Sequence, residues 1–111
     1  MINFSLYSKY QKELYGRETI THENYGFMTY KVYDDNSIYI HGLYIDPQYR
    51  RFNVSGELEK QVIEKHNPTV IYCYVDMTTL HPEQSLGCIM KNGYNIVECD
   101  STKIVLRKEI V

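Results

Sequence analysis

The sequence has no tryptophan, only three prolines and three cysteines, and no long uninterrupted apolar run. No run approaches the roughly 20 residues of a membrane span, so we expect no membrane segment. Residues Met1 to Ser5 lack the basic and apolar regions of a signal peptide. Cys73, Cys88 and Cys99 form an odd set without CxxC spacing, which argues against a disulfide framework or a metal site and favours free thiols in a reducing cytoplasm.

An excess of basic residues is also missing. Twelve Lys and Arg stand against fourteen Asp and Glu, giving a net charge of −2. A dedicated nucleic-acid binder usually shows the opposite balance, so nucleic acid is an improbable partner. The length of 111 residues and the apolar fraction of 43% suit one domain, residues 1–111, with one core.

Tyrosine is the one residue type in marked excess, with twelve copies. Because tyrosine favours strands and tolerates half-exposed positions, its abundance indicates a strand-rich domain with amphipathic faces. The alternative interpretation is an aromatic interaction surface.

The first half of the chain predicts a helix followed by an antiparallel meander. Leu6, Tyr10 and Leu14 recur at helical spacing within residues 5–15, and Gly16 is a plausible stop. Residues 18–22, 25–33 and 38–45 are strand-like, and residues 34–37 have turn chemistry. Asp46 and the proline after it break the third strand.

The second half predicts a βαβ unit and then a helix with two more strands. Residues 50–55 are a polar loop before a helix over 55–66, whose Glu57, Glu59, Lys60, Glu64 and Lys65 are expected to face water. Residues 69–75 form an apolar run typical of a parallel strand buried on both faces. Residues 82–91 predict a helix, and residues 94–99 and 103–110 two strands. The fold class is therefore α+β, a mixed sheet with helices on its faces.

One phrase of sequence carries a family resemblance. Leu43-Tyr44-Ile45-Asp46-Pro47-Gln48-Tyr49-Arg50, followed by a loop and an amphipathic helix, resembles the GNAT acetyltransferases, in which a Gly-rich pyrophosphate loop comes next. Lys91-Asn92-Gly93-Tyr94 is similar to the phrase that ends the family's last helix. The resemblance covers about residues 17–110 and implies an acyl-CoA N-acyltransferase-like fold. Within it, the N-terminus is expected to be truncated, with the family's first strand and helix missing or reduced to residues 5–15.

The resemblance implies a binding site for acetyl-CoA as cosubstrate. A helix N-terminus suits a pyrophosphate because its backbone N–H groups and dipole favour anions, and arginines can add charged hydrogen bonds. The cofactor-binding residues implied are Leu43, Tyr44, Ile45, Arg50, Arg51, Phe52, Asn53, Val54, Ser55 and Gly56.

The loop and the last helix depart from the family pattern. Asn53 and Ser55 replace the two loop glycines; Asn53 tolerates a left-handed backbone, and Ser55 could serve as a helix N-cap. Ile89 stands where many members have a tyrosine that protonates the departing thiolate. The alternative for the loop is a capped strand-to-helix turn that binds no ligand.

Two residues are candidate catalytic bases. His41 lies on the strand that leads into the motif, where some members place a histidine, and its ordinary pKa suits a base. Asp76 ends the apolar strand 69–75, at the edge where α/β sheets bind ligands. Each has a structural alternative, as a half-buried strand histidine and as a turn former.

Three functions compete. The leading one is an N-acetyltransferase in which a primary amine attacks the thioester, backbone amides after Leu43 polarise the carbonyl, and His41 is the base. The acceptor, a small molecule or a protein, is not specified by the sequence. The alternatives are a GNAT-fold binding module that has lost the reaction, and an unrelated α+β interaction domain with a tyrosine face. A homodimer that covers a free sheet edge is also compatible with the sequence.

Overall fold

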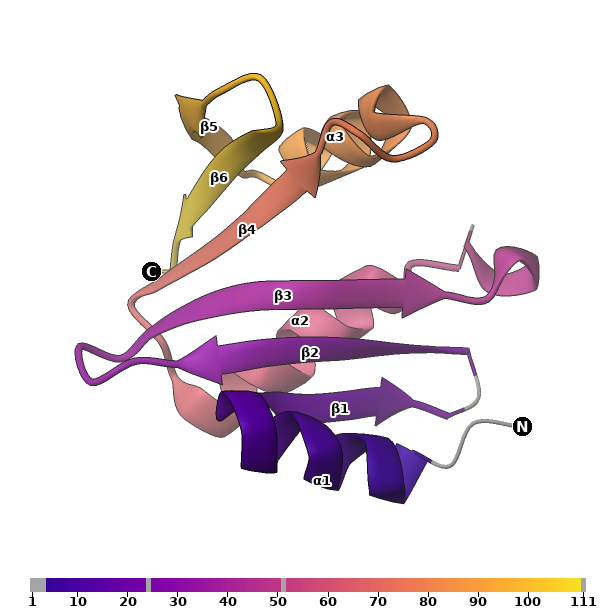
Figure 1. The fold of residues 1–111 in the computed structure, drawn as a ribbon, viewed down its shortest axis with the longest axis vertical. Helices are drawn as coiled ribbons and strands as arrows, with labels where there is room; N and C mark the ends of the chain where they lie inside the picture. The colour runs from indigo at the N-terminus through magenta and orange to yellow at the C-terminus, as the bar shows by residue number, and fades with distance from the viewer. Residues whose placement is uncertain (1–3, 24, 51, 111) are drawn as a thin grey trace.

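The computed structural model describes residues 4–23, 25–50 and 52–110 (Figure 1). It contains three α-helices, six strands and one short 3₁₀ helix among the described residues. In chain order the elements are α1 (Phe4–Tyr15), β1 (Glu18–His22), β2 (Gly26–Val32), β3 (Ser37–Ile45), η1 (Pro47–Tyr49), α2 (Val54–His66), β4 (Val70–Asp76), α3 (Pro82–Lys91), β5 (Asn95–Cys99) and β6 (Lys103–Glu109).

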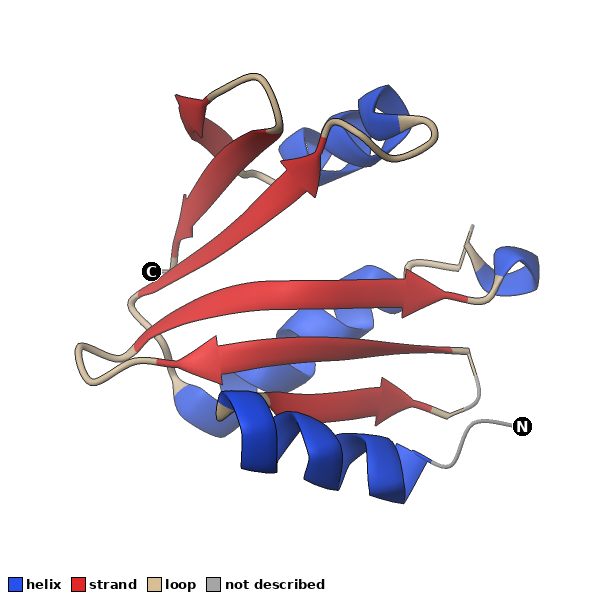
Figure 2. Ribbon diagram, viewed as in Figure 1, coloured by secondary structure: helices blue, strands red, loops and turns tan. Residues whose placement is uncertain are grey.

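All six strands form one mixed sheet in the order β1-β2-β3-β4-β6-β5 (Figure 2). β3 and β4 are parallel, and every other neighbouring pair is antiparallel. The parallel pair confirms the βαβ unit, with α2 as its crossover helix. Across the described residues, no helix is long and apolar enough to cross a membrane.

The helices cover both faces of the sheet, as expected. Successive strand residues point to opposite faces, and Phe27 meets Phe4 and Tyr7 of α1 in edge-to-face contacts. Its neighbour Met28 points the other way, into the core beneath α2. Figure 1 accordingly shows α1 in front of the sheet and α2 behind it. The core lies between α2 and the sheet, and Leu86 and Ile89 of α3 pack against it. Its buried members are Met28, Tyr30, Ile38, Val54, Leu58, Val62, Ile71, Cys73, Val75, Tyr94, Ile104 and Leu106.

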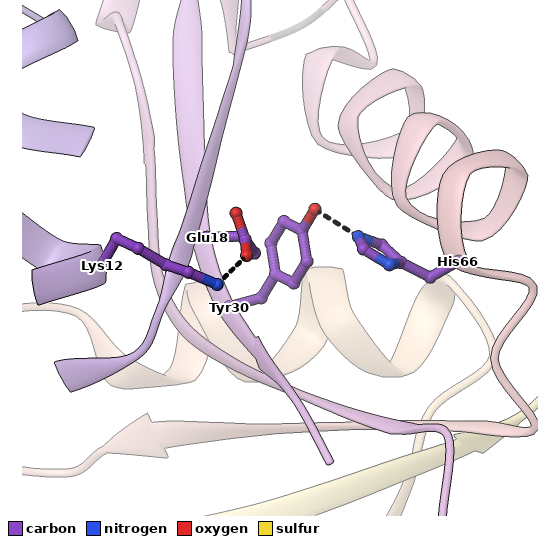
Figure 3. Close-up of polar contacts among 4 residues, drawn as sticks. All are labelled: Lys12, Glu18, Tyr30 and His66. Atoms are coloured by element: carbon purple, nitrogen blue, oxygen red, sulfur yellow. Dashed lines mark hydrogen bonds and ion pairs between the residues drawn. The ribbon is translucent and has the colours of Figure 1, made fainter. Parts of the chain in front are cut away.

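Two side-chain contacts fasten helices to the two faces (Figure 3). Lys12 of α1 pairs with Glu18 of β1. The Tyr30 hydroxyl lies 2.8 Å from Nε2 of His66, the last residue of α2. Burial raises the pKa of Tyr30 to about 12, so the phenol stays neutral and the contact is an uncharged hydrogen bond.

Burial of β4 on both faces was a wrong prediction. Ile71, Cys73 and Val75 are buried under the helices, but Tyr72 is half-buried and Tyr74 is exposed on the opposite face. The reason is that the tyrosine hydroxyl tolerates water, so a run that reads as apolar still has one wet face.

The apolar stripe of α1 lies on the outer side of that helix. Leu6, Tyr10 and Leu14 are 64%, 47% and 59% exposed, whereas the polar Gln11 is buried against the sheet. The spacing therefore predicted the helix correctly, but the helix packs on the sheet through a different side.

Candidate functional site

The sheet opens between β3 and β4. The two strands pair only at Ser37–Val70, Ile38–Ile71 and Tyr39–Tyr72. Beyond these pairs β4 remains bonded to β6 up to Asp76, and β3 remains bonded to β2 up to Ile45. The facing edges of β3 and β4 therefore diverge, and Figure 1 shows the widening space between them. Backbone N–H and C=O groups along such an edge are available to a bound ligand.

His41 lies where this opening begins. The register of β2 against β3 skips it, since Thr29 pairs with Gly42 and Tyr30 pairs with Ile40, so His41 is the extra residue of a β-bulge. Its ring stacks on Tyr39 at 5.0 Å between centroids. Burial lowers the pKa of His41, and the positive charges of Arg17 and Lys31 lower it further. The imidazole is therefore neutral at pH 7 and can accept a proton.

A cavity of about 380 Å³ fills the space between the diverging strands, α2 and α3. Both predicted bases, His41 and Asp76, line it, as do Leu43 and Ser55. The rest of the wall is formed by Met28, Ile40, Gly42, Glu59, Cys73, Tyr74, Val75, Thr79, Ser85, Cys88, Ile89, Asn92 and Tyr94. The cavity thus brings candidate residues from β3, β4 and α2 to one place.

Asp76 lies at the mouth of the cavity but is engaged in a turn. Its Oδ1 accepts hydrogen bonds from the Thr78 backbone N–H at 2.9 Å and from the Thr78 hydroxyl at 2.6 Å. These bonds lower the pKa of Asp76, which makes it a weaker base than a free aspartate. Of the two candidates, His41 is the better suited to accept a proton near neutral pH.

The segment after β3 is organised by the motif residues. The Asp46 side chain accepts from the Gln48 backbone N–H at 3.0 Å, which caps η1. Tyr49 stacks on Tyr25 at 3.9 Å between centroids. Arg50 donates from Nε to the carbonyl of Ile45 at 3.0 Å, so its guanidinium returns to the end of β3. Arg50 therefore lies between the strand end and the start of α2.

α2 begins with a left-handed residue. Asn53 is the N-cap with φ 56° and ψ 36°, a conformation that asparagine tolerates better than most residues. Its side chain makes no capping bond and lies over Gly56, where an added Cβ would come within 2.5 Å of Asn53 Oδ1. Ser55 as the N-cap was a wrong prediction, because α2 starts at Val54 and Ser55 lies inside its first turn.

The other predicted loop residues take different positions. Val54 is buried in the core, so only its backbone can face a ligand, whereas Phe52 is 69% exposed. Tyr44 is exposed and has the Arg50 guanidinium 5.9 Å from its ring centre. Arg51 lies outside the described residues. The first N–H groups of any helix have no partner within it, so the first turn of α2 offers donors to an anion.

The wall contributed by α3 has isoleucine at position 89, where the family resemblance led us to look for a tyrosine acid. Ile89 lines the cavity and packs against the core. Cys88 beside it is exposed, and Cys73 across the cavity is buried, which raises its thiol pKa to about 12. Neither Ile89 nor a thiol with so high a pKa supplies an acid at neutral pH.

Sequence reasoning missed Glu59, which we expected to face water. It lines the cavity, with its side chain only 14% exposed. Its carboxylate accepts from Lys108 of β6 at 2.6 Å and from the Tyr94 hydroxyl at 3.2 Å. Burial and the negative charge of Glu59 raise the pKa of Tyr94. The partner on β6 is 49 residues away, so no local pattern in α2 could reveal it.

No protein-family model matches the sequence, and no curated protein matches it significantly. Solved structures do resemble the fold. The PaiA N-acetyltransferase of Thermoplasma acidophilum, in complex with coenzyme A, is 19% identical over 78% of this chain with a TM-score of 0.65, and this chain spans 54% of that protein.

Two further structures cover nearly the whole chain. A GNAT family acetyltransferase from Elizabethkingia anophelis with acetyl-CoA bound has a TM-score of 0.67, with 15% identity over 99% of this chain and 92% of that one. The Campylobacter jejuni N-acetyltransferase PseH, in complex with acetyl coenzyme A, has a TM-score of 0.71, with 16% identity over 97% of this chain and 80% of that one. Identities this low establish the fold alone, and that fold is the GNAT acyl-CoA N-acyltransferase fold that the sequence predicted.

Proposed function

We propose that this GNAT-fold chain binds acetyl-CoA and transfers the acetyl group to a primary amine. The observation that carries the proposal is the opening between β3 and β4, which leads from the first turn of α2 into the cavity where His41 lies. The relatives of this fold that hold coenzyme A or acetyl-CoA support it.

The pyrophosphate would bind at the start of α2. The residues for this role are those of the loop, Arg50 to Gly56, through helix N–H groups and arginine charge. The pantothenate arm would lie along Leu43 to Ile45, where the edge of β3 is open on the side of β4. Its thioester would then reach the cavity lined by His41 and Leu43.

The reaction is a direct attack of the amine on the thioester carbonyl. The amine nitrogen forms the new C–N bond, and backbone N–H groups after Leu43 stabilise the oxyanion. His41, neutral because its pKa is lowered, accepts the proton that the amine loses. The C–S bond then breaks and CoA leaves as a thiolate, which takes its proton from water because Ile89 carries no hydroxyl. Asp76 is the reserve base at the mouth of the cavity.

A binding module without chemistry is the second candidate, and the cavity wall at Ile89 favours it. A domain of this kind would bind CoA and release no thiol.

Both proposals are tested with CoA and acetyl-CoA. Titration calorimetry and thermal shift should show binding, since a ligand that prefers the native state must raise the melting temperature. Arg50→Ala should weaken binding, with a loss of about 1.5–3 kcal/mol if its charged hydrogen bond to phosphate forms. Lys65→Ala, at the exposed far end of the same helix, is the control and should not.

Turnover is measured as thiol release with polyamines, aminoglycosides, lysine peptides and protein N-termini as acceptors. Release with any of them supports the transferase. Binding without release supports the binding module, and no binding at millimolar CoA contradicts both.

A further inference from the structure

The outer side of α1 forms an exposed apolar stripe, defined here as Leu6, Tyr10, Leu14 and Tyr15. These side chains are 64%, 47%, 59% and 46% exposed. Three of them follow each other at i, i+4 and i+8, so they lie in a row along three turns of helix. Single exposed apolar residues are ordinary, but a continuous row on one helix marks an interaction surface.

The orientation of α1 is fixed by contacts on its other sides, where Phe4 and Tyr7 pack against Phe27 of β2 and polar residues also meet the sheet. Lys12 pairs with Glu18 of β1 (Figure 3), and Gln11 is buried against the sheet with its Oε1 unpaired. Thr29 Oγ1, also buried, is unpaired as well. An amphipathic helix normally buries its apolar stripe, so this arrangement keeps the stripe outward at some cost.

We propose that a second copy of the chain covers the stripe, with the two α1 helices packed antiparallel. A two-fold axis near Tyr10 places Leu6 opposite the partner's Leu14 and the two Tyr10 rings together. A two-fold interface uses the same surface patch on both subunits, so a self-complementary row is what it requires.

The charges beside the stripe fit an antiparallel arrangement. Lys9 and Glu13, both exposed, lie one turn apart on the same flank of the row. In an antiparallel pair, this flank of one helix lies against the same flank of the other helix, which runs in the opposite direction. Lys9 therefore meets the partner's Glu13, and Glu13 meets the partner's Lys9. Opposite charges therefore face each other twice.

The edge of the sheet adjoins the stripe. Among the described residues β1 is the outermost strand and pairs with β2 alone, and Figure 1 shows α1 lying along it. A contact centred on α1 would extend over this edge and shield it from other strands. The four stripe side chains expose on the order of 400 Å² per copy, so a pair would bury about 800 Å² before the edge is counted. That area predicts a weak dimer.

Sedimentation equilibrium and light scattering from about 1 μM to 1 mM test this inference. The wild-type chain should dimerise with a dissociation constant on the order of 10–500 μM. Leu14→Glu should shift the constant at least tenfold or abolish the dimer. Leu80→Glu, at a residue that is 88% exposed in the loop before α3, is the matched control and should dimerise like the wild type.

A charge exchange tests the antiparallel register. Lys9→Glu and Glu13→Lys should each weaken the dimer several-fold, because each places like charges opposite one another. The double variant should restore it. A wild type that stays monomeric at 1 mM, or a Leu14→Glu variant that dimerises normally, would overturn the proposal. A double variant no better than the single ones would overturn the antiparallel arrangement.

Discussion

Replacing Lys108 with methionine removes the charge that balances Glu59 in the wall of the cavity. The ammonium lies 2.6 Å from the Glu59 carboxylate, and the two side chains are 28% and 14% exposed. Methionine keeps most of the length and the apolar stem of lysine, so the substitution tests the charge with little loss of packing.

The exposure of the pair sets the expected magnitude. Breaking a fully buried pair costs about 3–5 kcal/mol, and an exposed pair is worth about 0.2–1 kcal/mol. Because Lys108 still reaches water, we expect Lys108→Met to lower the free energy of unfolding by about 2–3 kcal/mol. That is a large part of the 5–15 kcal/mol typical of a domain. The corresponding fall in melting temperature is roughly 8–12 °C.

Urea denaturation followed by far-UV circular dichroism measures the change. Glu59→Gln should cost less than Lys108→Met, since the lysine left behind can turn toward solvent. Glu59→Gln combined with Lys108→Met should therefore recover part of the loss.

Lys60→Met, at an exposed position of α2, is the control and should change stability by less than about 0.5 kcal/mol. A Lys108→Met variant as stable as this control would refute the reasoning, because it would mean that water screens Glu59 as it does a surface carboxylate.

Three further predictions concern other residues. His41→Ala should lower kcat/KM for acetyl transfer by on the order of 10²-fold with CoA affinity unchanged. The wild-type rate should rise with pH through a midpoint below about 6.5, because burial lowers the pKa of His41. A His41→Ala rate equal to wild type would exclude His41 as the base. Burial and Lys65 lower the pKa of His66, so the unfolded chain binds the proton more tightly. Stability should fall as the pH drops below about 6.5, and His66→Gln should flatten that slope in urea titrations at pH 7 and pH 5. Asn53→Ala should cost about 1 kcal/mol in urea denaturation because φ is 56°, whereas Asn53→Gly should cost almost nothing; equal losses would show that backbone conformation is not what selects asparagine here.

The strands of this fold were predictable because local chemistry marks them. The predicted strand bounds lie within one or two residues of those observed. They followed from the alternation in β2, from the aromatic and β-branched run of β3, and from the proline at 47 that ends it. The left-handed residue at the start of α2 was also anticipated for Asn53, since few other residues accept that conformation. Its consequence, a helix that begins one residue earlier than expected, depended on backbone angles that composition does not reveal.

The parts that could not be predicted depend on contacts between distant segments. Glu59 has the same local pattern as its water-facing neighbours, and only its contact with Lys108 on another strand distinguishes it. The spacing of Leu6, Tyr10 and Leu14 shows that a stripe exists but not whether the sheet or something else covers it. The bulge at His41 likewise follows from how β2 and β3 align, which no single strand specifies.

The three paired residues that join β3 to β4 have a mechanical consequence. They are the only ladder, among the described residues, that connects the meander β1-β2-β3 to the hairpin β5-β6 with β4. Remaining contacts between these two halves include the side chains of the shared core, the hydrogen bond from Tyr74 to the His41 carbonyl and the pairing of Lys108 with Glu59. Such a seam is where transient opening of a sheet is expected to begin. A ligand that forms hydrogen bonds to the edges of both β3 and β4 would hold the two halves together across this seam. Binding at the site would therefore reduce the local opening of the whole sheet.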